Sequence, residues 1–298
     1  MNVSILGSTG FVGRNLLNSI PKSKGISLRE DNWQQALERT DVIINLVGKA
    51  HDHGKNATEQ DFYYANLELT KKVFNAFISS SASLLLHFSS LAAIEEYEAN
   101  IPLDEEGECN PHSWYGKSKR EAERWLLSQP LTQDKKLVVL RPPMIHGPGD
   151  KGNLGLLYKF IEKGIPYPLS AFKNNRSFIS IYNLSFLVEK IISDYKEIPV
   201  GIYHVADDEP LSTNDLIRIM AQVRGKKVRK IEMPKTFIKF IARIGDVIPI
   251  PLNSTRLKKM TSDLLVSNKK IKTVLGIQAL PLSAEEGLTK TIRSFSNE

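Results

Sequence analysis

Cysteine is nearly absent from this sequence, since Cys109 is the single one among 298 residues. One cysteine cannot form an internal disulfide, and no Cys or His spacing typical of a metal site occurs. We therefore expect no bound metal and a reducing, cytoplasmic compartment. Long apolar runs are missing as well. No run approaches the roughly 20 residues that span a bilayer, and the N-terminus lacks the basic segment of a secretory signal.

A strong charge of one sign is also missing, because 40 Lys and Arg face 33 Asp and Glu, for a net charge of +7. The basic residues are scattered apart from residues 226–230 and 269–270, which favours solvated faces. Attraction of a polyanionic small molecule or of an acidic membrane surface stays open. No nucleic-acid-binding module is recognisable, so we expect no nucleic-acid partner. Residues 237–244 are amphipathic, and we expect them to pack on the protein rather than on a membrane.

Short apolar runs alternate with amphipathic stretches in the first half of the chain. We expect strands at residues 2–6, 26–29, 42–47, 83–88 and 137–140, and helices at residues 12–19, 33–39, 58–80 and 114–128. Such alternation implies parallel strands joined by right-handed crossovers. The sequence therefore predicts an α/β fold with a doubly wound parallel sheet over residues 1–150, joined by later segments near 176–205.

The pattern changes after Arg141, where proline and glycine crowd a short stretch. Helices are expected at residues 154–163, 183–195, 212–224, 235–245 and 283–295, with a short strand at 202–205. Ser212 and Asp215 have the spacing of a helix capping box. Residues 151–298 therefore form mostly a smaller C-terminal lobe, which we expect to bind the substrate.

Three glycines, Gly7, Gly10 and Gly13, follow the first expected strand directly. A glycine-rich turn between a strand and a helix lets the backbone approach a dinucleotide pyrophosphate, which the helix N-terminus then binds. The spacing is G-x-x-G-x-x-G rather than G-x-G-x-x-G, and an ordinary strand–helix turn is the alternative. The expected cofactor-binding residues here are Gly7, Ser8, Thr9, Gly10, Phe11, Val12, Gly13 and Arg14.

The end of the second expected strand bears on the choice between NAD and NADP. An acidic residue there would bind the ribose 2′-hydroxyl of NAD, whereas an arginine would favour the 2′-phosphate of NADP. Residues 29–32 offer both signs. Arg29 or Arg14 would bind the phosphate, so the sequence slightly favours NADP over NAD.

Tyr115 and Lys119 are four residues apart and so share one helix face, and Ser90 follows a buried strand. A phenol is a poor base at neutral pH, but a nearby ammonium and an oxidised nicotinamide stabilise its anion. The Ser90 hydroxyl can hold a substrate oxygen while Tyr115 gives or takes its proton. We therefore expect Ser90, Tyr115 and Lys119 to be catalytic, with a surface Tyr/Lys pair as the alternative.

These motifs resemble the extended short-chain dehydrogenase/reductase family, in particular its nucleotide-sugar epimerases, dehydratases and reductases. The resemblance rests on residues 7–13, 45–48, 87–90, 113–119 and 141–149 and covers nearly the whole chain. It implies a Rossmann-type fold and further cofactor contacts at Leu46, Val47, Gly48, Pro142, Pro143 and His146, besides Tyr115 and Lys119. It also implies substrate contacts at Asn153 and Arg176, besides Ser90 and Tyr115.

The resemblance further implies a nucleotide-diphosphate sugar as substrate, most consistent with a UDP-sugar. Arg176 would bind the diphosphate, because a guanidinium matches phosphate oxygens. A surface ion pair is the alternative for Arg176. The resemblance also implies a homodimer that forms through the helices near 60–79 and 114–128.

The chain departs from the family in its N-terminal half, because only 31 residues separate Gly13 from Asn45. Full-length members carry about one more strand–helix unit there, and that unit borders the adenine. The shortened half leaves cofactor choice and retention open.

Three functions are compatible with these residues. The favoured one is an NAD(P)-dependent reductase of a nucleotide-linked 4-keto sugar, in surface-polysaccharide biosynthesis. The second is a 4-epimerase that retains NAD, and the third is a non-catalytic, NADP-sensing scaffold. A 4,6-dehydratase is disfavoured, because Leu91 and Ala92 follow Ser90 where such enzymes carry an acid/base pair.

Overall fold

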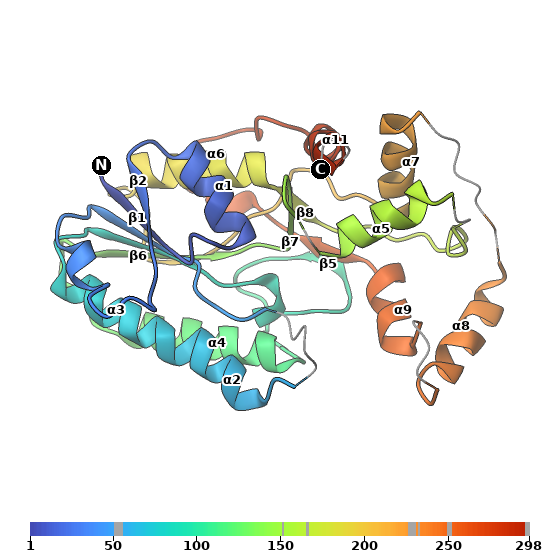
Figure 1. Cartoon of the computed structure of the whole chain (residues 1–298), viewed down its shortest axis with the longest axis horizontal. Helices are drawn as coiled ribbons and strands as arrows, with labels where there is room; N and C mark the ends of the chain where they lie inside the picture. Colours follow the sequence, from blue (N-terminus) through green and yellow to red (C-terminus); the bar gives the residue numbers. More distant parts are fainter. Residues whose placement is uncertain are drawn as a thin grey trace.

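The computed structural model describes residues 1–50, 56–150, 152–164, 167–225, 231, 233–248 and 252–295. A six-stranded sheet with the order β2-β1-β3-β4-β6-β9 runs through it, and every neighbouring pair is parallel (Figure 1). The strands are β1 (Val3–Leu6), β2 (Ser23–Ile26), β3 (Val42–Asn45), β4 (Leu84–Phe88), β6 (Lys136–Arg141) and β9 (Gly201–His204). The prediction of a Rossmann-type parallel sheet is confirmed.

Apolar side chains on both faces of the strands build two cores. In β3, Val42 and Ile44 point into one core and Ile43 into the other, because successive side chains of a strand alternate. Helices α1 (Phe11–Ser19) and α6 (Ile181–Asp194) cover the first face (Figure 1). Helices α2 (Glu59–Tyr63), α3 (Leu69–Ser79) and α4 (Trp114–Ser128) cover the second. The sheet is thus buried on both faces, as parallel sheets usually are.

The N-terminal half differs from the expectation in two places. The second strand is Ser23–Ile26 rather than 26–29, because Ile26 pairs with Leu6, the last residue of β1. The expected helix at 33–39 is a single 3-10 turn, η1 (Gln35–Leu37). As the order of the sheet shows, β2 is one of its two edge strands, next to β1.

A second lobe has its own apolar core. Its helices are α5 (Asn153–Glu162), α7 (Thr213–Val223), α8 (Lys235–Ile244), α9 (Ser254–Thr261) and α11 (Ala284–Phe295). The capping box at Ser212 and Asp215 is confirmed at the start of α7. No helix in the described ranges is long and apolar enough to cross a membrane.

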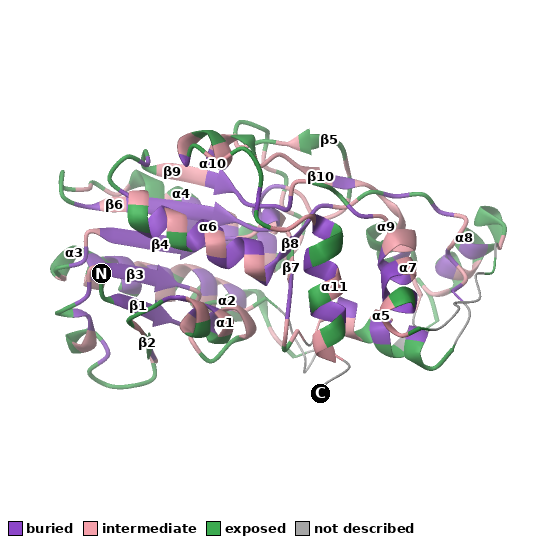
Figure 2. Cartoon of the chain, turned by 90° about the horizontal axis from the view of Figure 1, so that it is seen from above, coloured by how far each residue is buried: buried purple, intermediate pink, exposed green. Residues whose placement is uncertain are grey.

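Segments from both halves of the chain cross between the lobes. Strand β5 (Ala99–Leu103) pairs with β10 (Leu264–Val266), and β7 (Met144–His146) pairs with β8 (Phe178–Ser180). A short helix, α10 (Lys269–Val274), contacts β9. Figure 2 shows the central strands buried along their length and α8 largely exposed at the far end of the second lobe.

Candidate active site

The turn between β1 and α1 forms a glycine cradle. Gly7 has φ +81°, and a Cβ on Gly13 would lie 2.5 Å from the Gly7 carbonyl oxygen. Helix α1 begins at Phe11, and its N-cap residue Gly10 offers no side chain, so the first N–H groups have no partner from a capping side chain. Backbone donors and a helix dipole at such a turn suit a pyrophosphate. The residues present therefore fit a dinucleotide cofactor.

Charged residues of both signs follow the end of β2. Arg29, Glu30 and Asp31 are all exposed there, and Arg14 is exposed on α1. An arginine would attract a 2′-phosphate, whereas a carboxylate would bind a 2′-hydroxyl. The charge pattern at this edge therefore does not select between NADP and NAD.

The structure brings Ser90, Tyr115 and Lys119 together at the carboxyl end of β4. Ser90 caps the 3-10 turn η3 (Leu91–Ala93), accepting the Ala92 N–H at 3.2 Å. The Tyr115 hydroxyl, from the first turn of α4, hydrogen-bonds the Ser90 side chain. Lys119 lies one turn further along α4, and its ammonium donates to the Phe88 carbonyl at 2.8 Å. A phenol, a hydroxyl and an ammonium thus share the sheet edge at which ligands of such folds bind.

Burial shifts the pKa of both catalytic candidates on α4. It raises the pKa of the Tyr115 phenol, and the Ser90 hydrogen bond offsets part of this rise. Burial lowers the pKa of Lys119 to about 8, against the opposing charge of Glu123. In the protein, the net shift of the phenol pKa is therefore upward, opposite to the lowering expected from the ammonium and an oxidised nicotinamide together.

Asn66 connects the loop after β3 to helix α4. It lies in the π-helical turn η2 (Tyr64–Glu68), which interrupts the helix expected over 58–80. Its amide donates to the Ser118 hydroxyl at 2.9 Å and to the Lys49 carbonyl at 3.1 Å. Its oxygen accepts the Lys49 N–H at 2.9 Å. A π turn inside a helix often marks a functional position, and here it holds two segments of the site in register.

The loop after β3 comprises Leu46, Val47 and Gly48. The Val47 N–H donates to the side chain of Asn45 at 3.1 Å, and Gly48 is exposed. A Cβ on Gly48 would lie 2.6 Å from the Asn66 oxygen and 3.1 Å from the Lys119 ammonium nitrogen. The absence of a side chain at Gly48 therefore lets this loop approach the catalytic helix closely.

A buried ion pair that sequence reasoning missed lies beneath the catalytic group. Glu123 accepts from the Arg141 guanidinium at 2.8 and 2.7 Å and from the Ser89 hydroxyl at 2.5 Å. Both charged side chains are at most 1% exposed. Glu123 lies one turn after Lys119 on the same face of α4, so helical spacing is the signal that could have found it.

Arg176 lies at the junction of three segments of the second lobe. Its backbone bridges Leu211 and Leu264, and its guanidinium donates to the Ser262 carbonyl at 3.3 Å. Burial lowers its pKa to about 10, against the charge of Asp263. It forms no ion pair with any residue in the described ranges. The alternative interpretation as a surface ion pair is therefore not seen.

The other predicted ligand contacts stay predictions. Pro142 is buried and its carbonyl accepts the Leu91 N–H at 2.9 Å, whereas Pro143 is partly exposed. Asn153 begins α5, and its side chain lies outside the described residues, as do His51, Asp52 and His53. In the part of the chain that the structure describes, no three His, Cys, Asp or Glu side chains are grouped to hold a metal.

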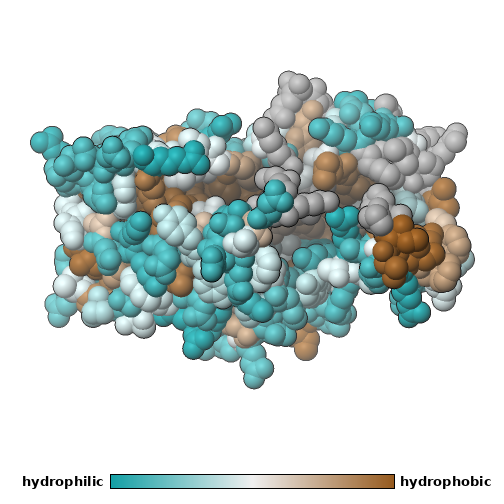
Figure 3. All heavy atoms as spheres, turned by 60° about the horizontal axis from the view of Figure 1, so that its bottom comes forward, coloured by the Kyte–Doolittle hydropathy of each residue, from teal (hydrophilic) through white to brown (hydrophobic). Residues whose placement is uncertain are grey.

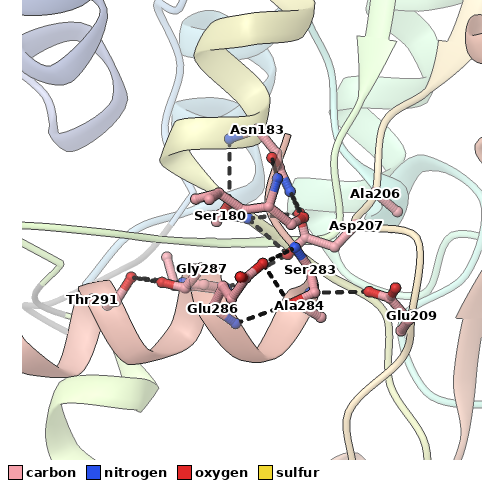
Figure 4. Close-up of polar contacts among 12 residues, drawn as sticks. Ser180, Asn183, Ala206, Asp207, Glu209, Ser283, Ala284, Glu286, Gly287 and Thr291 are labelled. Carbon is pink, nitrogen blue, oxygen red and sulfur yellow. Dashed lines mark hydrogen bonds and ion pairs between the residues drawn. The ribbon is translucent and has the colours of Figure 1, made fainter. Parts of the chain in front are cut away.

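Figure 4 shows Ser180, Asn183, Asp207 and Thr291 in a buried polar cluster between the lobes. His146 belongs to the same cluster. Its Nδ1 lies 2.9 Å from the Thr291 hydroxyl, and its Nε2 lies 3.9 Å from the Asp207 carboxylate. Asp207 accepts from the Asn183 amide at 2.7 Å and from the Ser180 N–H at 3.1 Å. Burial raises the pKa of Asp207 to about 7 and lowers that of His146 to about 4. These contacts join β7, β8, α6 and α11, and a cofactor contact at His146 stays a prediction.

Comparison with known proteins points to one family. The model of the NAD dependent epimerase/dehydratase family matches residues 3–206. The UDP-glucose 4-epimerase of Vibrio cholerae is 26% identical over 320 residues, 99% of this chain and 95% of that protein. The N-acetyl-alpha-D-glucosaminyl-diphospho-ditrans,octacis-undecaprenol 4-epimerase of Escherichia coli O157:H7 is 25% identical over 324 residues, 98% of this chain and 94% of that protein.

Solved structures share the fold along the whole chain. The UDP-glucuronic acid 4-epimerase from Bacillus cereus, in complex with NAD, has a TM-score of 0.77 at 16% identity, over 100% of this chain and 99% of that one. RMD from Pseudomonas aeruginosa, complexed with NADPH, has a TM-score of 0.74 at 16% identity, over 100% of both chains.

Proposed function

Because the chain belongs to the NAD dependent epimerase/dehydratase family, we propose that it is a 4-epimerase of a hexose linked to a diphosphate. One observation carries the proposal. The Ser90–Tyr115–Lys119 group lies at the carboxyl end of β4, in a chain that is similar over at least 98% of its length to two 4-epimerases. The sequence alone favours the reductase, and the two epimerase relatives shift that preference.

Tyr115 and Ser90 have separate roles in the transfer of one proton. Tyr115 takes the proton of the sugar 4-hydroxyl as the C4 hydride leaves, and it returns the proton when hydride arrives at the opposite face. The Ser90 hydroxyl, already bonded to the Tyr115 phenol, holds the same sugar oxygen in both steps. When bound on the glycine cradle, oxidised NAD(P) supplies positive charge beside the phenol and a carbon that accepts and returns the hydride.

Lys119 keeps the reacting groups in place. Its ammonium is held by the Phe88 carbonyl and lies under the Gly48 loop, so it supports the position of a bound nicotinamide ribose. Its lowered pKa of about 8 leaves it mostly protonated at neutral pH. The presence of both Tyr115 and Lys119 speaks against the non-catalytic scaffold.

We infer a diphosphate in the substrate from Arg176, whose guanidinium fork suits phosphate oxygens. It is partly exposed, and although the charge of Asp263 acts on it, no ion pair joins these two residues, so a bound diphosphate would add counter-charge. A UDP-sugar fits this requirement, and so does a sugar on a lipid diphosphate, the substrate named for the Escherichia coli relative. A role in polysaccharide biosynthesis is consistent with either substrate.

Cofactor demand tests the reaction directly. Purified protein is incubated with UDP-glucose or UDP-N-acetylglucosamine and a trace of NAD, and the sugars are identified by NMR. A 4-epimerase converts the substrate to its C4 epimer with no net change in the cofactor. Consumption of one NADPH per molecule of a UDP-4-keto sugar, without epimer formation from the UDP-hexoses, would replace the proposal by a reductase.

The reductase is the second candidate, and the shortened N-terminal half favours it. Strand β2 is the edge of the sheet, so the strand–helix unit that borders the adenine in full-length members is missing. A cofactor with fewer adenine contacts would exchange more readily, which suits a reductase that must release NADP after each turnover. The same NMR and NADPH measurements separate the two reactions.

We propose a homodimer through α2, α3 and α4. Four large apolar side chains are exposed on these helices and the turn η2, namely Tyr64, Ile78, Trp114 and Leu127. Exposed apolar patches commonly mark interaction surfaces. Light scattering during size-exclusion chromatography measures the mass, and a monomer at micromolar concentration would contradict this interface.

A further inference from the structure

Helix α8 buries one side and exposes another that is strongly apolar. Ile238 and Ala242 are at most 2% exposed, because they pack into the core of the second lobe. The exposed side is formed by five large side chains in α8 and the turn after it: Phe237 at 49%, Phe240 at 61%, Ile244 at 37%, Val247 at 88% and Ile248 at 54%. We call these five residues the α8 apolar face. The expectation that residues 237–244 pack on the protein therefore holds for one side of the helix only.

The spacing of the five residues makes a continuous stripe. Phe237, Phe240 and Ile244 are three and four residues apart, and such side chains lie on one face of a helix. Val247 and Ile248 continue the same spacing beyond the last helical residue. Figure 3 shows hydrophobic side chains gathered at the end of the molecule where Figure 1 draws α8. A group of this size on the surface of a protein marks an interaction site.

The charges beside this stripe are mostly positive. Lys239 and Arg243 are exposed on α8, and neither forms an ion pair with a residue in the described ranges. Residues 235–260 contain six Lys and Arg and a single acid, Asp246. Asp246 accepts hydrogen bonds from the N–H and hydroxyl of Ser254, so its charge is partly engaged. The surface around the stripe is therefore basic.

From this arrangement we propose that the α8 apolar face binds the surface of an anionic lipid bilayer. The five side chains enter the boundary between headgroups and acyl chains, and Lys239 and Arg243 contact lipid phosphates. An exposed aromatic and aliphatic stripe with basic residues is the composition of helices that lie in the membrane interface. A second copy of the chain is a poorer occupant, because it would bring the same cations together.

Binding at this face would bring the second lobe to the membrane. Helix α8 packs against α9, and the carbonyl of Ser262, which directly follows α9, accepts a hydrogen bond from Arg176. The expected diphosphate-binding residue is therefore one helix away from the proposed membrane surface. The proposal concerns the outer face of the lobe and does not depend on which reaction the chain catalyses.

Vesicle sedimentation of the whole protein tests the proposal without any need for activity. Vesicles of phosphatidylcholine with phosphatidylglycerol are compared with vesicles of phosphatidylcholine alone. Wild-type protein should sediment with the anionic vesicles and less with the neutral ones, and added salt should weaken binding. The double variant Phe237→Ser/Phe240→Ser should bind at least about tenfold more weakly, because each buried aromatic side chain contributes strongly.

Two further variants sharpen the result. Lys239→Gln/Arg243→Gln should reduce the preference for anionic vesicles. Ile101→Ser, on exposed β5 and outside the α8 apolar face, should bind like the wild type, since Ile101 is 79% exposed but remote in sequence. Circular dichroism melting confirms that each variant is folded. The proposal would be overturned if the wild type sediments with neither kind of vesicle, or if the Phe237/Phe240 double variant binds as strongly as the wild type. It would also be overturned if the wild type forms a dimer and only the Phe237/Phe240 double variant is monomeric.

Discussion

The sheet edge at Ser90, Tyr115 and Lys119 buries its charges, whereas helix α8 of the second lobe exposes both charges and large apolar side chains. At the sheet edge, the charges of Glu123, Arg141 and Lys119 are buried, and each has a partner within the chain. On α8, the cations Lys239 and Arg243 and two large aromatic rings face solvent, and neither cation forms an ion pair within the described part of the chain. The comparison teaches that buried charges paired within the chain fix the positions of the side chains proposed for catalysis. Exposed cations and aromatic rings that lack such contacts point instead to a partner outside the chain.

Removing the Tyr115 hydroxyl should have the largest effect of the changes considered, and it tests the proposed role of the sheet edge in catalysis. Tyr115→Phe should lower the turnover rate by about 10²- to 10⁴-fold, because the phenol is the group that exchanges the proton in the proposed mechanism. The free energy of unfolding should barely change, since the ring remains. Tyr64→Phe, at a 55% exposed tyrosine, is the control and should keep full activity. Activity of the Tyr115 variant near the wild-type rate would reject the assigned role.

The buried ion pair beneath the site should dominate stability. Glu123→Gln leaves the Arg141 guanidinium buried without a counter-charge, and we expect a loss of about 3–5 kcal/mol in the free energy of unfolding. Glu121→Gln is the matched control two residues away, because Glu121 forms an exposed pair with Arg124 and should cost less than about 1 kcal/mol. Urea unfolding measures both, and equal losses would contradict the distinction.

The glycine cradle can be separated into its folding and binding roles. Gly13→Ala places a Cβ 2.5 Å from a backbone oxygen, so it should destabilise the protein by about 1–3 kcal/mol and weaken cofactor binding. The nearest atom to a Cβ on Gly10 is at 3.4 Å, so Gly10→Ala should fold normally. If Gly10→Ala binds the cofactor more weakly in a fluorescence titration, the loss of affinity would then come from the cofactor contact and not from a loss of stability. Normal stability of Gly13→Ala would show that the turn relaxes.

The buried pair between the lobes gives the smallest effect, and it depends on pH. The raised pKa of Asp207, about 7 against 3.8, makes stability fall as pH rises from 4 to 7. The lowered pKa of His146, about 4 against 6.5, makes stability rise over nearly the same window. In the wild type the two slopes oppose each other, so this pair should contribute a nearly flat profile.

The variant Asp207→Asn should remove the fall in stability with pH that Asp207 causes and leave the rise that His146 causes. Its stability should rise with pH between about 4 and 6.5, by at most about 1.4 kcal/mol per pH unit. Asp194→Asn, at an exposed carboxylate paired with Lys190, is the control and should keep the profile of the wild type in this window. Thermal melting across this pH range provides the measurement. A flat profile for the Asp207 variant would show that His146 does not titrate as expected.

Local signals in the sequence predict the parts of the site that lie close together along the chain. The strand before Gly7 and the spacing of Tyr115 and Lys119 indicate the cradle and the catalytic helix, because both are patterns of consecutive residues. The π turn at Asn66 was not predicted, since no local pattern distinguishes it from the regular helix around it. The pairing of Glu123 with Arg141 joins residues 18 apart on different elements, and only the packing of α4 on β6 creates it.

By itself, the sequence determined the parallel α/β fold, the glycine turn and the candidate side chains for proton transfer, because these follow from periodicity and short-range spacing. The tertiary structure decided which charges are buried, which pKa values shift and which side of α8 meets solvent. Those properties depend on how segments distant in the chain exclude water from one another. No pattern of neighbouring residues encodes that exclusion, so it becomes visible only when the two lobes are assembled.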